Sequence, residues 1–372
     1  MSDRPLPLLF IMSNMRETGG AEQSIATLIP HLIEHARLRV FVENDRHHDD
    51  LQRHAGPQLA LTRMPKGNAP RALWGALQTL RRAWREEPPD AVLANGHKGS
   101  FLLAFAKLAG LPTAAPTGIF LRDFNYYLLW LVLRVLPGAL YLAPSEAVFE
   151  DARYRRWGLV APRRLLALPN AVRLGSTPPD ESADAPLFVA ACARLARWKG
   201  LHLLIRAWPQ VRAAFPTAEL RIYGEEVEPE YAAELKALAE ELALGGAVHF
   251  CGYQRDLTPV FSTAAVLVVP SLSLRPGPET FSRIIIEAWA HAKPVVAFAT
   301  GGPRYLIEDG ADGYLVAEGD VEALAARLRQ LLADPALRQR LGEKGRAKVR
   351  EKFDPEKLAA VLLSQLLTAP RP

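Results

Sequence analysis

Two basic residues in the second half of the chain could bind a diphosphate. Arg194 and Lys199 lie in "ACARLARWKG", which continues an apolar run, and Gly200 stands where a helix is expected to begin. An arginine binds phosphate oxygens bidentately, a lysine adds a point charge, and a helix start offers free N–H groups. Residue type alone also allows two solvated loop cations. Their position directly after a strand favours the diphosphate interpretation.

Two carboxylates further along the chain could bind hydroxyl groups. Glu279 and Glu287 flank a strongly apolar run, and a helix starting near Phe281 would place Glu279 just before its N-terminus and Glu287 two turns in. Eight residues of helix cover about 12 Å, so the carboxylates cannot act as a close catalytic pair on one bond. They suit the sugar and the ribose of a nucleotide sugar. The alternatives are simple compatibility of Glu279 with the helix dipole and a solvated Glu287.

A glycine pair near the N-terminus could approach a phosphate. Gly19 and Gly20, in "SNMRETGGAEQ", follow the first apolar run at the expected start of a helix. They allow a tight backbone approach, and the free N–H groups of a helix start attract anions. The motif lacks the GxGxxG pattern of dinucleotide sites. A phosphate contact and a plain strand-to-helix turn are both compatible with it.

Short apolar runs alternate with amphipathic stretches along nearly the whole chain, which predicts βα units and parallel sheets. In the first half we expect strands over residues 8–12, 39–43, 90–94, 112–117, 140–144 and 165–169. In the second half we expect strands over residues 187–193, 220–225, 248–253, 266–271, 294–299 and 313–317, followed by helices within 320–353 and from 354. The segment "DRHHDD", residues 45–50, is expected to be a solvated loop and not a metal site.

One stretch rich in proline, serine and acidic residues predicts a linker over residues 173–186. It separates residues 1–172 from residues 187–353, so we expect two doubly wound domains with a cleft between them. Ligands of such domains bind at the carboxyl ends of the strands.

The order of these motifs resembles the GT4 family of retaining glycosyltransferases, which have the GT-B fold. The resemblance rests on Gly-Gly-Ala-Glu at 19–22, "ARLARWKG", "VHFCGYQRDL", "VLVVPS", the two glutamates and "KPVVAFATGGPRYLIEDGADGYLV". It implies an α/β protein with two Rossmann-like, doubly wound domains facing a central cleft. The first domain would bind the acceptor and the second the nucleotide sugar, and the helix within 354–372 would cross back to the first.

The resemblance also implies roles for individual residues. Arg194, Lys199 and Glu279 would be catalytic: the two cations would hold the diphosphate and stabilise it as it leaves, and Glu279 would contact the donor sugar. Glu287 would bind the ribose. The other residues expected around the donor are Gly19, Gly20, Gly224, Tyr253, Thr280, Phe281 and Ser282.

The chain departs from the family in the loop "IFLRDFNYY". Many members carry a histidine there, where this chain has Arg122 and Asp123, and the nearest histidine, His97, follows an earlier strand. His97, Arg122 and Asp123 are therefore the candidates for an acceptor-side or catalytic loop.

Two further departures touch the expected sugar pocket. Ser282 replaces a family glycine, and Arg304 and Tyr305 stand where a glutamate is common. The identity of the donor sugar therefore cannot be inferred from better-known relatives.

The expected function is retaining transfer of a hexose-type sugar from a UDP- or GDP-linked donor to an acceptor hydroxyl, without a metal or another cofactor. The acceptor would be a saccharide or a lipid-linked saccharide of lipopolysaccharide, exopolysaccharide or glycolipid synthesis. The alternatives are a GT-B-fold nucleotide-sugar isomerase and a non-catalytic nucleotide-sugar-binding protein.

Charge and cysteine usage bear on partners and location. Two cysteines among 372 residues predict a reducing, cytoplasmic environment, and the net charge of +5 permits contact with anionic membrane at the inner face of the cell membrane. No basic run interleaved with aromatics or zinc motif supports nucleic-acid binding. In the apolar segment 124–142, Arg134 and the Pro137-Gly138 break favour a buried helix and strand over a membrane span. For the amphipathic helix around residues 71–88, a solvated arginine face is preferred to lipid contact.

Overall fold

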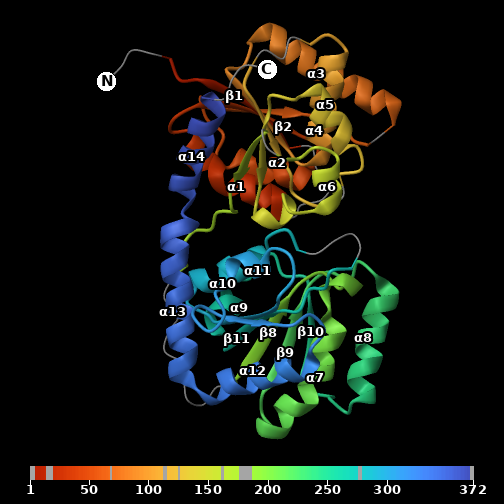
Figure 1. The fold of residues 1–372 in the computed structure, drawn as a ribbon, viewed down its shortest axis with the longest axis vertical. Helices are drawn as coiled ribbons and strands as arrows, with labels where there is room; N and C mark the ends of the chain where they lie inside the picture. The colour runs from red at the N-terminus through yellow and green to blue at the C-terminus, as the bar shows by residue number, and fades with distance from the viewer. Residues whose placement is uncertain are drawn as a thin grey trace. The chain divides into compact units, whose positions relative to one another are not determined.

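The computed structural model describes residues 5–13, 20–67, 69–111, 115–124, 126–160, 163–175, 187–274 and 279–368. The chain forms two compact units, Met1–Ala171 with Asp354–Pro372, and Val172–Phe353 (Figure 1). Most of the predicted linker, residues 176–186, lies outside the described residues.

The first unit is built on a parallel sheet of seven strands in the order β3-β2-β1-β4-β5-β6-β7. Near-continuous apolar runs form its central strands because helices bury both faces of the sheet. The strands are β1 (Leu8–Ser13), β2 (Arg37–Val42), β3 (Leu59–Arg63), β4 (Ala91–Asn95), β5 (Thr117–Phe120), β6 (Leu140–Ala143) and β7 (Arg164–Ala167).

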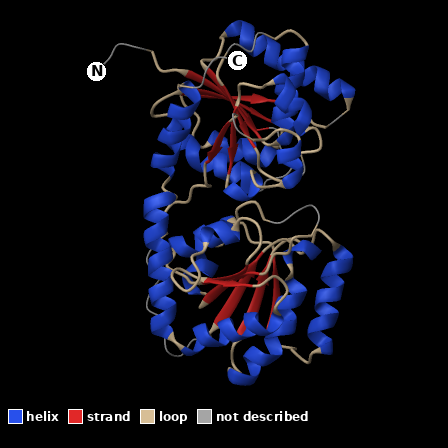
Figure 2. Ribbon diagram, viewed as in Figure 1, coloured by secondary structure: helices blue, strands red, loops and turns tan. Residues whose placement is uncertain are grey.

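Helices cover both faces of this sheet (Figures 1 and 2). One buried cluster joins the sheet to α3 (Pro70–Glu86), α4 (His97–Leu108), α5 (Leu129–Val135) and α6 (Ala152–Arg156). The other joins it to α1 (Gly20–Leu32), α2 (Asp45–Gln52) and α14 (Pro355–Leu367). The end of the chain is thus part of the first unit's core, where Leu366 lies so close to Gly118 that a Cβ there would require it to shift.

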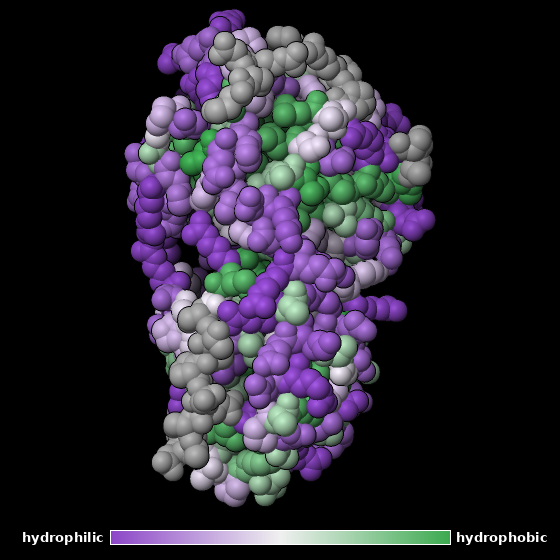
Figure 3. All heavy atoms as spheres, turned by 90° about the vertical axis from the view of Figure 1, so that its left-hand side faces the viewer, coloured by the Kyte–Doolittle hydropathy of each residue, from purple (hydrophilic) through white to green (hydrophobic). Residues whose placement is uncertain are grey.

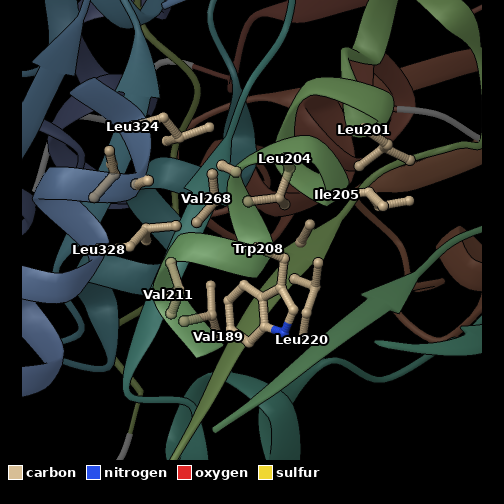
Figure 4. Packing of buried hydrophobic residues seen from close by; sticks show 14 of the residues in the cluster. Val189, Leu201, Leu204, Ile205, Trp208, Val211, Leu220, Val268, Leu324 and Leu328 are labelled. Carbon is tan, nitrogen blue, oxygen red and sulfur yellow. The ribbon is translucent and has the colours of Figure 1, made fainter. Parts of the chain in front are cut away.

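The second unit repeats the arrangement with six parallel strands in the order β10-β9-β8-β11-β12-β13. They are β8 (Phe188–Cys192), β9 (Glu219–Tyr223), β10 (Val248–Gly252), β11 (Val266–Val269), β12 (Val295–Phe298) and β13 (Tyr314–Val316). Trp208 is fully buried and packs with Val189, Leu220 and Leu328 between the sheet and its helices (Figure 4).

Two groups of helices enclose the second sheet. One face carries α7 (Leu201–Ala214), α8 (Pro229–Glu241) and α12 (Val321–Ala333). The other carries α9 (Thr258–Thr263), α10 (Arg283–Ala290), α11 (Pro303–Leu306) and α13 (Pro335–Lys352). Aspartates begin α12, α13 and α14: the side chains of Asp320, Asp334 and Asp354 each accept a backbone N–H of the first turn. On the second unit, the face on which α13 lies is largely hydrophilic (Figure 3).

Three predictions about the first unit were wrong. The strand predicted over 112–117 begins at Thr117, since Pro116 has no N–H for the ladder. The edge strand β3 was missed because only one of its five residues is buried. Two are half-buried and two are exposed, without the alternation typical of a strand. Residues 45–50 are not a loop: they belong to α2, which Asn44 caps by accepting the N–H of His47 at 3.1 Å.

The apolar segment 124–142 was predicted to contain a helix and a strand, and the structure confirms both. It contains the short helix α5 and then β6. Among the residues that the structure describes, no helix combines the length and the apolar character needed to cross a bilayer.

Because His47 is buried, the stability of the first unit should depend on pH. Its ring nitrogen Nε2 lies 3.0 Å from the Ser13 hydroxyl, and burial lowers the pKa of His47 from 6.5 to about 4. Between these two values the unfolded chain binds a proton that the folded chain does not, so stability is lost as the pH falls from 6.5 to 4. Well above pH 6.5 the group is neutral in both states.

We expect His47 to account for about 3 kcal/mol of this loss in the free energy of unfolding. Urea denaturation of the wild type and of His47→Gln between pH 7 and pH 4.5 measures it, with the exposed His35→Gln as control. The glutamine variant should give a shallower pH dependence. An unchanged slope would mean that another group is responsible.

Candidate functional site

The strand order of the second unit has a switch point between β8 and β11. From β8 the chain continues through β9 and β10 on one side, then crosses to β11 on the other side. In doubly wound sheets the loops at such a point diverge, and ligands bind at the carboxyl ends of the strands there. Lys199 follows β8, and Ser271 and Glu279 follow β11.

Lys199 and Glu279 form an ion pair at this switch point. The side chains retain 14% and 13% of their exposure, so both charges are largely shielded from water. The Ser271 hydroxyl donates to the same Glu279 oxygen, Oε1, at 3.3 Å, and Lys199 Nζ lies 3.9 Å from the centre of the Trp198 ring. The structure therefore brings together a predicted diphosphate-binding residue and a predicted sugar-binding residue.

Close backbone contacts hold this pair in place. Gly200 adopts a φ of +66°, and a Cβ there would overlap the carbonyl of Pro270, so only glycine fits between Lys199 and α7. The N–H of Gly302 donates to the backbone carbonyl of Glu279 at 2.6 Å. A Cβ on Gly302 would overlap the backbone of Phe281. The three loops after β8, β11 and β12 are therefore locked together.

The loop after β8 also packs against the loop after β9. A Cβ on Gly224 would overlap the Ala193 carbonyl, which explains a glycine here by packing alone. Arg194 is exposed beside this contact. Tyr253, after β10, is 62% exposed. Both side chains are accessible to a ligand.

Glu287 lies in α10 and pairs with Arg283 one turn earlier, with Arg283 Nη2 2.9 Å from Glu287 Oε1. Burial and, secondarily, the negative charge of Glu287 raise the pKa of the Cys192 thiol to about 12. The Glu287 side chain itself retains 19% of its exposure and is therefore not in bulk solvent.

The residues between the two glutamates differ in what they offer a ligand. Phe281 is 2% exposed and packs edge-on against Phe353, so its side chain belongs to the core. Thr280 is half-buried. Ser282 precedes α10 with a φ of +71°, a conformation that glycine adopts at lower cost. This explains why a glycine is suited to the position.

In the first unit, His97 and Asp123 meet at the carboxyl ends of β4 and β5. His97 Nδ1 lies 3.5 Å from Asp123 Oδ2, and the ring contacts Tyr126 edge-on at 5.8 Å between centroids. His97 is the first residue of α4 and remains partly exposed. Of the three acceptor-loop candidates, these two form one accessible pair.

Arg122, the third candidate, is buried in a polar network. Its guanidinium donates to Asn95 at 2.7 Å, to Asn170 at 2.8 Å and to Ser24 at 3.2 Å, and it stacks on the Phe120 ring. It ties the ends of β4 and β5 to α1 and to the segment that leaves the unit. Its position is that of a brace for the loops that form the edge.

The glycine pair is only partly described. Gly19 lies outside the described residues, and Gly20 is the exposed first residue of α1. A second ion pair at the same edge was not predicted from the sequence. Lys98 binds the buried Glu43, which also accepts the N–H of Gly67 at 2.7 Å. Ser271 was missed as well. The available signal was a polar residue directly after a buried strand.

Among the described residues, no cluster of three or more histidine, cysteine, aspartate or glutamate side chains could hold a metal ion.

Family models match both halves of the chain. The model "Glycosyl transferases group 1" matches residues 178–348, and "Glycosyltransferase Family 4" matches residues 18–175. The chain belongs to the GT4 glycosyltransferases. The predicted family is thus confirmed, and the paired Lys199 and Glu279 fall within the first model.

Among the similar proteins are two lipopolysaccharide core biosynthesis glycosyltransferases of Rhizobium meliloti (strain 1021). LpsE is 34% identical over 191 residues, which are 51% of this GT4 chain and 52% of LpsE. LpsD is 29% identical over 280 residues, 74% of each protein. The chain therefore spans about half the length of the first relative and three quarters of the second.

Solved structures confirm the predicted GT-B fold with its two Rossmann-like sheets. Anabaena Alr3699/HepE, solved in complex with UDP and glucose, superposes with a TM-score of 0.81 at 21% identity, over 98% of this chain and 100% of that one. Sucrose-phosphate synthase of Thermosynechococcus elongatus gives a TM-score of 0.77 at 21% identity, over the same shares.

The positive φ of Ser282 yields a stability prediction. At this position Ser282→Gly should be more stable than Ser282→Ala by about 1 kcal/mol, because alanine keeps the Cβ that disfavours this conformation. Chemical denaturation of both variants measures the difference.

The matched control is the same pair of substitutions at the exposed Ser364, in the interior of α14. There Ser364→Ala should be more stable than Ser364→Gly by about 1 kcal/mol. An alanine variant at Ser282 as stable as the glycine variant would contradict the assigned backbone conformation.

Proposed function

We propose that this chain is a retaining glycosyltransferase, which transfers a hexose-type sugar from a nucleoside-diphosphate donor to an acceptor hydroxyl. The observation that carries the proposal is the shielded pair of Lys199 and Glu279 at the switch point of the second sheet. A cation for a diphosphate and a carboxylate for sugar hydroxyls stand side by side there, where ligands of such sheets bind.

In this reaction the bond between the anomeric carbon and the diphosphate oxygen breaks, and its electron pair stays with the diphosphate. The acceptor oxygen bonds to the anomeric carbon on the same face, and its proton passes to the departing diphosphate. Arg194 and Lys199 stabilise the charge that develops on this leaving group. Glu279 binds the sugar hydroxyls and Glu287 the ribose. No metal or other cofactor takes part, since the two cations supply the positive charge.

We propose a UDP- or GDP-linked sugar as the donor, and the complex of HepE with UDP and glucose supports the uridine arm. The naming of LpsE and LpsD for lipopolysaccharide core biosynthesis supports a saccharide or lipid-linked acceptor of lipopolysaccharide, exopolysaccharide or glycolipid synthesis. On the acceptor side, His97, whose Nδ1 lies 3.5 Å from Asp123, contacts the hydroxyl-bearing sugar. The proposed location is the cytoplasm, at the inner face of the cell membrane.

A donor screen tests the function. Thermal shift and hydrolysis assays with UDP-, GDP-, ADP- and dTDP-sugars should give stabilisation by a uridine or guanosine donor, and Arg194→Ala should weaken donor binding about tenfold or more. NMR of the product should show the anomeric configuration of the donor.

Four results would overturn the proposal. If no nucleotide stabilises the protein, it binds no such donor, and an inverted product excludes retention. Conversion of the donor without any acceptor would instead support a nucleotide-sugar isomerase, and binding without turnover a non-catalytic protein.

The ion pair predicts opposite effects for its two members on the binding of nucleoside diphosphate alone. Glu279 competes with the diphosphate for Lys199, so Glu279→Gln should tighten diphosphate binding about three- to tenfold while lowering sugar transfer. Lys199→Met should weaken diphosphate binding about tenfold or more and lower transfer as well. Isothermal titration with UDP and GDP measures both effects.

Glu318→Gln is the matched control, because that carboxylate accepts the hydroxyl of Ser273 at 2.8 Å in the same unit without pairing to Lys199. Weaker diphosphate binding by Glu279→Gln would mean that the pair does not exchange partners on donor binding.

A further inference from the structure

A second ion pair, Lys98 with Glu43, lies at the carboxyl edge of the first sheet and has no role in the proposed reaction. Glu43 directly follows β2, and Lys98 is the second residue of α4, the helix after β4. The switch point of this sheet lies between β1 and β4, because the chain runs from β1 to β2 and β3 on one side and then crosses to β4 on the other. Ligands of doubly wound sheets bind at the carboxyl ends of the strands at such a point. The pair therefore borders the position expected for a ligand of this unit.

The two members of the pair differ in how far they are buried. The Glu43 side chain retains 3% of its exposure and the Lys98 side chain 22%. Glu43 Oε1 also accepts the N–H of Gly67 at 2.7 Å, so the carboxylate is held from two sides. The accessible end of the pair is therefore its positive end.

Lys98 has a donor left for a ligand. An ammonium group carries three N–H donors. Within the ranges that the structure describes, Lys98 Nζ makes two hydrogen bonds, one to Glu43 and one to the carbonyl of Gly67 at 3.1 Å. A ligand can accept the third hydrogen while Glu43 keeps its partner. This matters because a buried carboxylate that loses its partner is strongly destabilising.

The charges beside the pair favour a negatively charged ligand. Asp45, the next carboxylate after Glu43, is matched by Lys66 and by Arg63, whose Nη1 lies 2.6 Å from Asp45 Oδ1. The first turn of α4, to which Lys98 belongs, adds the positive end of a helix dipole. A hydrogen bond gains strength when its partners are ionised. A carboxylate or a phosphate therefore suits Lys98 better than a neutral hydroxyl.

We propose that Lys98 binds an anionic group, a carboxylate or a phosphate, on the acceptor saccharide, which is therefore an acidic sugar. The acceptor role rests on the proposed transferase function, in which His97 contacts the acceptor. His97 and Lys98 are neighbours in the first turn of α4, and they face different loops. His97 Nδ1 lies 3.5 Å from Asp123 Oδ2 after β5, whereas Lys98 binds Glu43 after β2. One sugar above the start of α4 can therefore present a hydroxyl to His97 and its charged group to Lys98.

The alternative is a structural role, in which Lys98 only braces the loop at Gly67. A brace would support acidic and neutral acceptors to the same extent. The preference for one kind of acceptor over the other is therefore the quantity that separates the two roles.

A glycan array tests the acidic acceptor with the full chain and an excess of UDP and GDP, which occupies the donor site. Glycans ending in glucuronate, galacturonate or phosphorylated glucose are printed beside glycans ending in glucose or galactose. The wild type should bind the acidic glycans at least about tenfold more tightly, and added NaCl should reduce this preference. The stronger of the carboxylate and phosphate sets identifies the charged group.

The two members of the pair should have opposite effects on the acidic glycans. Lys98→Met should lower their binding about tenfold or more and leave the neutral glycans unchanged. Glu43→Gln should raise it about three- to tenfold, because the amide still accepts the N–H of Gly67 but no longer neutralises Lys98. The double variant Lys98→Met with Glu43→Gln should show the same loss as Lys98→Met. It contains no buried carboxylate without a partner, so the test does not depend on the folding of the single lysine variant.

Two control variants separate the pair from charge elsewhere in the unit. Lys107→Met makes the same substitution at the other end of α4. Glu86→Gln removes a carboxylate of α3 that pairs with Arg39 at 2.9 Å. Both variants should bind all glycans like the wild type.

Equal binding of acidic and neutral glycans by the wild type, or binding of neither, would overturn the acidic acceptor. So would a Lys98→Met variant that loses both sets equally, because Lys98 would then be a brace. A chain that binds UDP or GDP without preferring acidic glycans keeps the proposed donor binding and loses only the acidic acceptor. A chain that prefers acidic glycans through Lys98 but binds no nucleotide keeps the anion site and loses the transferase function.

Discussion

The second unit depends on pairing two charges that it largely removes from water. An uncompensated charge in such a position costs several kcal/mol, so Lys199 and Glu279 must reach each other although they come from loops after different strands. The chain meets this requirement with backbone geometry. Gly200 brings the first loop against the Pro270 carbonyl, and Gly302 holds the carbonyl of Glu279. Neither glycine is replaceable by alanine without moving the pair.

This constraint also explains how a highly charged binding edge can exist before a ligand arrives. An anionic ligand can take over Lys199 only if Glu279 gains other partners, such as hydroxyl groups, at the same moment. A nucleotide sugar carries both chemistries in one molecule, whereas inorganic phosphate carries only the first. The first unit solves the same problem differently: the buried Arg122 is held by neutral groups, donating through Nε to Asn95 and through Nη1 to Asn170.

The features that were predicted from the sequence are those that a local residue pattern determines. The six strands of the second half were found because each is a short apolar run between polar turns, and the motif order identified the family. Pairing across loops was not predictable, because no local residue pattern indicates that Lys199, after β8, meets Glu279, after β11. The family resemblance placed Phe281 among the residues around the donor, and its side chain lies in the core against Phe353. The edge strand Leu59–Arg63 is not buried on both faces, so it lacks the continuous apolar run by which the other strands were predicted.

The helix α4 connects the carboxyl edge of the first sheet with an exposed apolar turn. Its N-terminal residue His97 stands at the carboxyl edge of the sheet with Asp123, and its C-terminal turn exposes Phe105 and Leu108 among basic side chains. Because His97 is the first residue of this helix and its ring contacts Tyr126 edge-on, the packing of α4 on the sheet fixes the position of the imidazole at the carboxyl edge.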